Sequence, residues 1–418
     1  MLKQIEGSRA IAETVALCRP EVICAYPITP QTHIVEALSE IVKSGALPRC
    51  SYVNVESEFA AMSVAMGASA AGARAYTATS SQGLLYMAEA VYNAGGLGLP
   101  IVMTLGTRAI GAPINIWNDH SDAMALRDAG WVQLFADSNQ EAVDLHVLAF
   151  RLAEELSIPV MVCVDGFILT HAVERIDVPS QEDVDALLPP FEPMQMLDPA
   201  APVTIGALVG PEAFTEVKAL AHHKQLRALE RIPVLSAELR RRLGRESGGL
   251  VRPYRTHDAK TIVVALGSVC GTIEEVVDAM RNEGTAVGLL DVCTFRPFPR
   301  DAIREALRGA DRVIVVEKNI AVGSMGGVLA SDVRMALERE TCSVQTVIAG
   351  LGGRAITRAS IRRAIEAANA GVLDELHFLD LDRSLVDREL TRMNETRRSG
   401  PHASNMLRDA PHPMRRVV

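Results

Sequence analysis

Short apolar runs alternate with longer amphipathic segments along most of the chain. Between residues 21 and 166 the runs predict buried strands, and apolar residues at every third or fourth position predict helices. The expected strands are 22–25, 52–55, 75–79, 101–105, 132–135 and 160–164, and the expected helices are 31–44, 59–71, 84–93 and 140–155. Strands that are apolar throughout, with helices between them, are typical of a parallel sheet covered on both faces.

The same pattern restarts near Lys260. Strands are expected at 261–266, 286–290, 312–316 and 344–348, and helices at 272–281, 300–307, 327–337 and 358–368. The proline-rich and charged segment between the two halves predicts a linking arm that packs across domains. We therefore expect an α/β protein of two doubly wound parallel-sheet domains, residues 1–180 and 259–375, joined by an arm over 181–258 and followed by a C-terminal extension over 376–418.

The C-terminal end is polar and locally basic from Arg392 onward. Its arginines include Arg397, Arg398, Arg408, Arg415 and Arg416. Such a segment has too few apolar residues for a core of its own. Two interpretations stay open, a solvated tail or a strap that becomes ordered against an acidic partner subunit.

Composition narrows the class of protein. The net charge of -9 argues against a general affinity for nucleic acid or acidic membranes. No apolar run reaches the roughly 18 residues that a membrane helix needs, and the N-terminus lacks an apolar leader, so a cytoplasmic protein is expected. None of the seven cysteines forms a CxxC pair, which favours buried reduced thiols over a cluster motif.

Ligands of doubly wound sheets bind outside the carboxyl ends of the strands, so the loops there deserve inspection. The first is AYPITPQT, residues 25–32. Pro30 has a backbone angle preset for the first turn of a helix, which would put Thr29 at the N-cap. Thr29 either only caps the helix, or the elbow aims its hydroxyl and the helix start at a ligand.

The second loop holds Glu56 and Glu58, two residues apart at a strand end. Glu58 leads into a helix of small residues that allows close packing. A carboxyl group desolvated there would have a raised pKa and could share a proton with a ligand nitrogen. The alternative is a solvated acid favoured by the helix dipole.

A long loop after the strand at 101–105 carries Arg108, whose planar fork suits a carboxylate; an ordinary surface arginine is the alternative. His120 beside Asp119 has too few neighbouring ligands for a metal site. The chain has no P-loop, no catalytic serine arrangement and no dinucleotide fingerprint. Two glycine-rich pieces, 323–327 and 350–353, favour tight packing over phosphate binding.

Five motifs occur together in one order: YPITP (26–30), ESEFAAMSVAMGAS (56–69), TATSSQGLLYMAEA (77–90), TRAIGAPINIWNDHSD (107–122) and VDGF (164–167). The series resembles the α subunit of the pyruvate:ferredoxin oxidoreductase family. FRPFP (295–299) and VVEKN (315–319) resemble that family's transketolase C-terminal-like domain. The resemblance covers about residues 5–375.

The resemblance implies thiamine diphosphate chemistry, the oxidative decarboxylation of a 2-oxo acid with coenzyme A to an acyl-CoA and CO₂. The first domain would bind the aminopyrimidine half of the cofactor, with Glu58 on a pyrimidine nitrogen and Glu56 in support. Arg108 would bind the substrate carboxylate, and Thr29 would contact both substrate and cofactor. Further cofactor contacts are implied for Tyr26, Pro27 and Ile28, and further substrate contacts for Ile110 and Asn115.

The chain lacks the glycine and the asparagine of the thiamine–magnesium motif around Asp165, so no metal ligand is expected from it. The resemblance therefore implies a β subunit that supplies Mg²⁺ and the diphosphate site. It also implies γ and ferredoxin-like δ subunits with [4Fe-4S] clusters, and transfer of electrons to ferredoxin or to NAD through an FAD-carrying subunit. Alone, the chain should be inactive.

The sequence leaves the substrate open between pyruvate and an aromatic 2-oxo acid such as phenylglyoxylate. The phenylglyoxylate dehydrogenase α subunit is one relative within this family, and the long arginine-rich extension leans slightly toward a specialised role. Two rival functions are a nucleotide-binding dehydrogenase, which would need a glycine fingerprint where YPITP stands, and a non-catalytic scaffold subunit.

Overall fold

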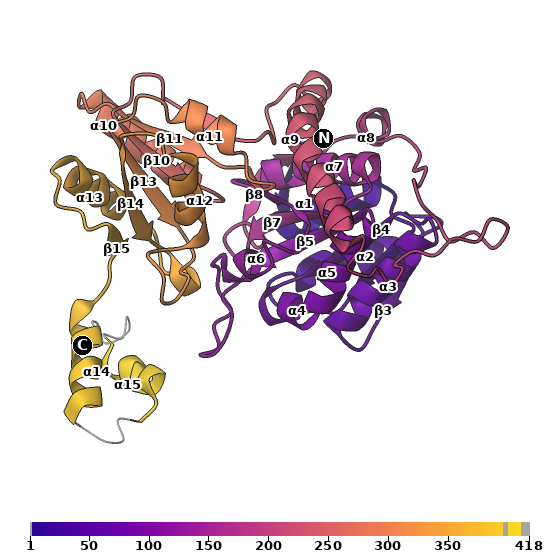
Figure 1. The fold of residues 1–418 in the computed structure, drawn as a ribbon, viewed down its shortest axis with the longest axis horizontal. Helices are drawn as coiled ribbons and strands as arrows, with labels where there is room; N and C mark the ends of the chain where they lie inside the picture. Colours follow the sequence, from indigo (N-terminus) through magenta and orange to yellow (C-terminus); the bar gives the residue numbers. More distant parts are fainter. Residues whose placement is uncertain (1, 396–399, 411–418) are drawn as a thin grey trace.

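The computed structural model of the chain describes residues 2–395 and 400–410. Two α/β domains lie side by side, each built around its own sheet (Figure 1). The predicted fold class is thereby confirmed: most strands are parallel, and helices cover both faces of each sheet.

The first sheet has seven strands in the order β12-β6-β7-β5-β4-β2-β3. Its bounds are β2 Val22–Ala25, β3 Ser51–Asn54, β4 Ala75–Thr79, β5 Ile101–Thr107, β6 Val132–Phe135, β7 Val160–Asp165 and β12 Thr294–Arg296. Six strands match the predicted apolar runs and are parallel. The seventh strand, β12, is antiparallel to β6 and comes from the second half of the chain. It was not predicted, because three residues are too few to show a hydrophobic pattern.

Two apolar layers flank this sheet. One holds α1 (Gly7–Leu17), α2 (Thr32–Lys43) and α7 (Asn139–Leu156), and the other holds α3 (Glu58–Ala70), α4 (Ser81–Tyr86), α5 (Ala88–Leu97) and the short α6 (Ser121–Ala125). The single helix predicted at 84–93 is therefore wrong. Two helices meet at Met87, and the first starts early because the carboxylate of Asp122 accepts the Ser81 N–H.

The second sheet has the order β15-β14-β13-β10-β11-β9, with only the edge strand β9 antiparallel. Its strands are β9 Arg252–Tyr254, β10 Thr261–Ala265, β11 Val287–Asp291, β13 Arg312–Glu317, β14 Ser343–Ile348 and β15 Leu376–Phe378. Helices α10 (Val269–Asn282) and α13 (Arg358–Asn369) cover one face, and α11 (Arg300–Ala306) and α12 (Val328–Ala336) cover the other; a short turn, η1, spans Leu351–Gly353. Strand β15 lies just beyond residue 375, the expected domain boundary.

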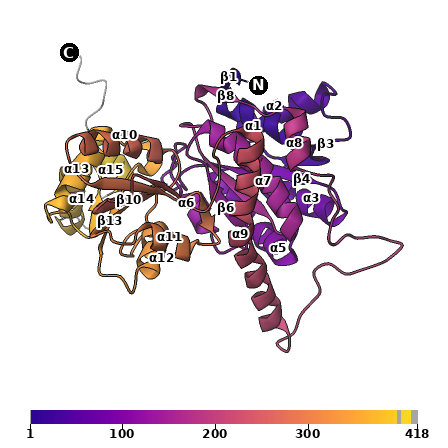
Figure 2. The same cartoon turned by 90° about the horizontal axis from the view of Figure 1, so that it is seen from above.

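The segment between the two sheets packs on the first domain. Helices α8 (Gln181–Leu187) and α9 (Phe214–Leu243) belong to it, and α9 packs on the first domain through Ala228, Ile232, Leu235 and Leu239. Figure 2 shows the N-terminal end of α9 and the preceding loop projecting from the body. Among the described helices, including the long α9, none is apolar enough to cross a membrane.

A two-stranded antiparallel sheet, β1 (Leu2–Glu6) with β8 (Val173–Asp177), joins the start of the chain to the segment after β7. At the other end, α14 (Arg383–Glu395) and α15 (His402–Asp409) pack together. Glu389 joins them by accepting from Arg392, His402 and Asn405. The described part of the extension thus holds the edge strand β15 and two helices; Arg397, Arg398, Arg415 and Arg416 lie outside the described residues.

A buried polar network joins the two domains at the end of β7. Asp165, which is 1% exposed, accepts from Lys318 of the second domain and lies 2.7 Å from His120 Nε2. The backbone N–H of Ser268 donates to the same carboxylate at 3.1 Å. Burial alone would raise the pKa of Asp165, but Lys318 and His120 hold it well below its usual range.

Apolar contacts complete the junction. Phe295 on β12 packs edge-on against Phe135 of β6, with ring centroids 6.0 Å apart. Both rings belong to one apolar cluster that runs from the first domain into the second. The two sheets therefore share part of their core, and a rigid placement of one domain on the other follows.

The buried ion pair between the domains predicts that Asp165→Asn strongly lowers the stability of the protein. The change leaves the buried charge of Lys318 without its counter-ion, so the free energy of unfolding should fall by about 3 kcal/mol or more. Asp311→Asn is the matched control, because its ion pair with Lys260 is exposed and should contribute no more than about 1 kcal/mol. Urea unfolding of both variants measures the difference.

Because the folded-state pKa of Asp165 is lowered, its contribution is present above the ordinary aspartate pKa of about 3.9 and is lost as the pH falls below it. The stability difference between wild type and Asp165→Asn should therefore be present at pH 7 and become smaller below about pH 4. Equal stabilities of the Asp165 and Asp311 variants would contradict the proposed importance of the buried pair.

Candidate functional site

The loops that follow β2, β3, β4, β5 and β7 lie at one edge of the first sheet, because these strands are parallel neighbours. The motifs at 26–30, 56–69, 77–90 and 107–122 supply the first four of these loops, and VDGF supplies the last. Motifs that are far apart in the sequence therefore meet at this edge.

The side chain of Gln31 anchors the YPITP loop by hydrogen bonds. This side chain is fully buried, and its Nε2 donates to the carbonyl oxygens of Tyr26 at 2.8 Å and Ala78 at 3.2 Å. The loop is thereby tied to the end of β4. Tyr26 and Pro27 are exposed, and Ile28 is half-buried.

The prediction that Thr29 caps α2 is wrong. The helix begins at Thr32, its N-cap position is Gln31, and no side chain caps it. The Thr29–Pro30 peptide is cis. The Thr29 side chain is exposed, while its carbonyl oxygen accepts a hydrogen bond of 2.8 Å from Arg108 Nη1.

Glu58 is the first residue of α3, and Ser57 caps that helix by accepting from the Ala60 N–H. Glu58 is 7% exposed, and its carboxylate makes no hydrogen bond to any described residue. Glu56, in contrast, is exposed. Glu58 is a largely buried residue whose carboxylate has no partner among the described residues, so it is the acid at this edge best placed to bind a ligand.

Gly83 makes the room that Glu58 occupies. A Cβ atom at Gly83 would lie 2.5 Å from Thr79 Oγ1 and 2.8 Å from Glu58 Oε1, so any other residue would displace both groups. Thr79 Oγ1, Ser80 Oγ and Gln31 Oε1 are buried and have no hydrogen-bond partner among residues 2–395 and 400–410. The edge therefore offers polar groups that the described residues leave unsatisfied.

Arg108 is 5% exposed and has a fixed direction. Its Nη1 donates to Thr29 O and its Nε to Asn115 O at 3.1 Å, while no described residue accepts from Nη2. Burial lowers its pKa, and the nearby carboxylate of Asp122 partly offsets that effect. Part of the guanidinium fork thus stays available to an anion.

Asp122 is a site residue that the sequence reasoning did not assign. It is fully buried, and its Oδ2 accepts from the backbone N–H groups of Ser81 at 2.8 Å and Arg108 at 3.0 Å. Burial raises its pKa to about 8, against the lowering effect of these donors. One carboxyl group therefore fixes the loops after β4 and β5, and only its place in the motif NDHSD could have indicated it.

The two other residues expected at the substrate pocket lie on the loop after Arg108. Ile110 is half-buried. The Asn115 amide donates to Gly352 O of the second domain at 3.2 Å, and its Oδ1 accepts from the Trp117 N–H. The structure thus brings Thr29, Arg108 and Asn115 together, and it uses the Asn115 side chain in the contact between domains.

Both glycine-rich pieces of the second half serve packing, as expected. A Cβ atom at Gly352 would lie 2.5 Å from Asn115 Nδ2, and one at Gly353 would lie 2.5 Å from Trp117 Cβ. Gly327 donates its N–H to Glu317 Oε1 at 2.9 Å. Close approach of neighbouring groups explains these glycines.

Groups of acidic, histidine or cysteine side chains near enough to share a metal ion occur in two places in the described chain. One is Glu6, His33 and His171. The other is Asp137, Glu141 and Asp291, where Arg252 already binds all three carboxylates. Neither group includes Glu58 or Arg108.

Two family models match the chain. The model described as pyruvate flavodoxin/ferredoxin oxidoreductase, thiamine diphosphate-binding, matches residues 13–236. The model described as pyruvate:ferredoxin oxidoreductase core domain II matches residues 259–361. The two matches fall on the two sheet domains.

Curated relatives match over most of their length. Pyruvate synthase subunit PorA of Methanosarcina barkeri is 45% identical over 91% of this chain and 97% of its own. The PorA subunit of Thermotoga maritima is 43% identical over 90% and 97%. Ketoisovalerate oxidoreductase subunit VorA of Pyrococcus abyssi is 36% identical over 91% and 98%.

Solved structures share the fold. The 2-oxoglutarate:ferredoxin oxidoreductase of Magnetococcus marinus, solved with 2-oxoglutarate, coenzyme A and succinyl-CoA, aligns with a TM-score of 0.64 at 19% identity. The alignment covers 88% of this chain and 64% of that longer one. A split-gene transketolase aligns at 0.53. The resemblance of the motifs is confirmed by the family models and the relatives together: the chain belongs to the pyruvate:ferredoxin oxidoreductase family.

Proposed function

We propose that the chain is the α subunit of a multisubunit pyruvate:ferredoxin oxidoreductase that uses thiamine diphosphate. The reaction converts pyruvate, coenzyme A and two oxidised ferredoxins into acetyl-CoA, CO₂, two reduced ferredoxins and a proton. The observation that carries the proposal is the buried, unpartnered carboxylate of Glu58 in the space left by Gly83. Identity of 41–48% to pyruvate synthase subunits supports pyruvate as the substrate.

Glu58 would hold the aminopyrimidine of the cofactor. The orphaned polar atoms of Thr79, Ser80 and Gln31 around it fit a ring that carries several nitrogen atoms. Bound thiamine diphosphate supplies the carbon nucleophile and electron sink that decarboxylation of a 2-oxo acid requires. Glu58 would bind and orient the ring and keep a shared proton at its carboxylate oxygen.

Arg108 would bind the carboxylate of pyruvate. Its two hydrogen bonds to backbone carbonyls hold the guanidinium in place and leave Nη2 to donate to a ligand. A partly buried arginine binds a carboxylate more strongly than an exposed one does, because water competes less. Thr29, Ile110 and Asn115 are proposed as its neighbours in the pocket.

Partner subunits would complete the site. Aromatic and aliphatic side chains on the loops that carry the site residues are exposed: Tyr26, Phe59, Ile114 and Trp117. Such side chains suit burial against a β subunit that brings Mg²⁺ and the diphosphate site. All seven cysteines are free thiols and five of them are buried, so the proposed [4Fe-4S] clusters would belong to the other subunits.

Purification of the complex from its source tests the proposal. We expect β, γ and δ subunits to co-purify and pyruvate with coenzyme A to reduce ferredoxin. The panel includes 2-ketoisovalerate and phenylglyoxylate, with NAD as the alternative acceptor. Faster turnover of phenylglyoxylate, or reduction of NAD through a flavin subunit, would overturn the proposed substrate or acceptor.

Glu58→Gln should lower the turnover number of the assembled complex by at least about 100-fold, since the variant cannot exchange a proton with the cofactor. Glu89→Gln is the matched control, because Glu89 is an exposed acid in the first turn of α5. Its turnover should stay within about twofold of wild type. Pyruvate-dependent reduction of ferredoxin measures both. Full activity of a correctly assembled Glu58→Gln complex would favour the non-catalytic scaffold instead.

Arg108→Ala should raise the KM for pyruvate by about 10-fold or more, while the KM for coenzyme A stays unchanged. Arg127→Ala is the control, because Arg127 also donates to a backbone carbonyl, of Met124, but lies outside the site. Steady-state kinetics of both variants separate KM from kcat. An unchanged KM for pyruvate in Arg108→Ala would exclude the carboxylate-binding role.

A further inference from the structure

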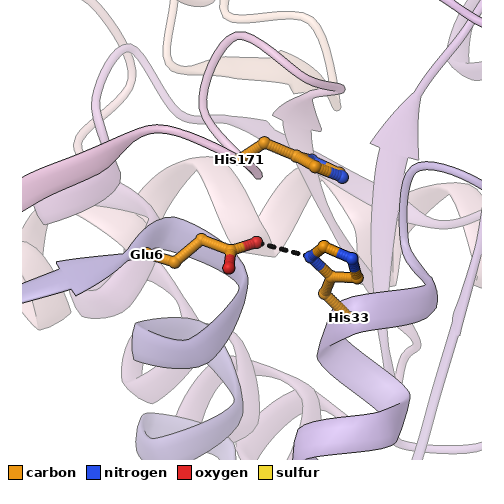
Figure 3. A group of neighbouring side chains, drawn as sticks. All are labelled: Glu6, His33 and His171. Carbon is orange, nitrogen blue, oxygen red and sulfur yellow. Dashed lines mark hydrogen bonds and ion pairs between the residues drawn. The ribbon is translucent and has the colours of Figure 1, made fainter.

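Glu6, His33 and His171 meet at the surface of the first domain, although they are far apart in the sequence (Figure 3). One potential ligand atom from each lies within 4.8 Å of the other two. Glu6 ends β1, His33 lies in the first turn of α2, and His171 follows the VDGF loop. None of the three belongs to the site described above.

The backbone around Glu6 and His171 is rigid. Glu6 is paired with Val173 in the β1–β8 ladder, and the Gly7 N–H donates to Ala172 O at 3.0 Å. The Ser8 hydroxyl also donates to Thr170 O at 2.7 Å. Glu6 therefore ends the ladder and His171 lies two residues before it, so the ladder holds the two backbones close together.

His171 is held in one orientation. Its ring lies between the rings of His33 and Phe167, with both centroid distances 4.6 Å. Its Nδ1 lies 2.7 Å from the hydroxyl of Thr170, which also accepts the Phe167 N–H. No described residue bonds to Nε2, so that nitrogen is free to bind a ligand. Fixing of one ring nitrogen by a hydrogen bond is the usual support of a metal-bound histidine.

His33 and Glu6 form the other side of the group. His33 Nδ1 lies 2.7 Å from Glu6 Oε1, and no lysine or arginine of the described chain pairs with Glu6. Their side chains are 49% and 30% exposed, so an ion from solvent can reach them.

We propose that Glu6, His33 and His171 form a binding site for a zinc-like divalent transition metal. Two imidazoles and one carboxylate are a ligand set typical of Zn²⁺, with a water in the fourth position. Zinc bonds of about 2.0–2.1 Å place ligand atoms about 3.3 Å apart, so Glu6 and His33 would separate slightly and His171 would move closer. The bound ion would cross-link β1, α2 and the loop after β7.

Calorimetric titration of the untagged full-length chain, purified with a chelator and then dialysed, tests the site with Zn²⁺ alone. We expect one Zn²⁺ per chain and no comparable binding of Mg²⁺, which prefers oxygen ligands. X-ray absorption should show nitrogen and oxygen neighbours at about 2.0–2.1 Å. Glu6→Gln, His33→Gln and His171→Gln should each weaken the affinity more than about 10-fold.

His257→Gln is the matched control, because His257 is exposed and lies outside the group; its affinity for Zn²⁺ should equal that of wild type. Unfolding temperatures measured in chelator show that the variants fold. Three results would overturn the proposal. They are no binding of Zn²⁺ by wild type, an affinity of the three site variants equal to that of wild type, or sulfur neighbours at about 2.3 Å, which would place the ion on cysteine thiols.

Discussion

The buried ion pair between Asp165 and Lys318 is the contact on which the rest of the structure depends. Each charge is almost completely removed from water and would be strongly unfavourable without the other. Asn118 takes part in the same network: its amide donates to the Thr107 hydroxyl at 2.8 Å, and its Oδ1 accepts from Lys318 at 3.1 Å. Thr107 and Asn118 lie on either side of the loop that carries Arg108, so the junction between the domains also fixes the geometry of the substrate-binding loop.

The site depends on supports of the same kind. Asp122 binds two backbone N–H groups and so sets the loops after β4 and β5, and Gln31 ties the YPITP loop to β4. In both cases one buried polar side chain fixes two loops. The polar atoms around Glu58 that these supports leave without a described partner are Gln31 Oε1, Thr79 Oγ1 and Ser80 Oγ. That arrangement is what a site completed by a cofactor and by a second subunit requires.

Apolar runs were sufficient to predict the parallel strands other than the short edge strand β15, because a strand buried on both faces has little choice of residue. They did not predict β12, whose three residues reach the first sheet through the tertiary fold. The prediction from Pro30 that Thr29 caps the helix was wrong, because the helix begins only at Thr32. Its N-cap residue, Gln31, is hydrogen-bonded to β4, a tertiary contact that local propensity does not contain. The motifs named Glu58 and Arg108 as the residues to examine. The role of Asp122 and the contact of VDGF with VVEKN between the domains could not be predicted from the sequence. Both depend on contacts between residues far apart in the chain.

The most direct test of the central claim is a structure of the purified complex with thiamine diphosphate bound. We expect the aminopyrimidine to lie against Gly83, with a ring nitrogen about 2.6–3.2 Å from the Glu58 carboxylate. We also expect Arg108 to face the substrate position while keeping its bond to Thr29 O. An aminopyrimidine bound elsewhere, with Glu58 still lacking a partner, would contradict the account.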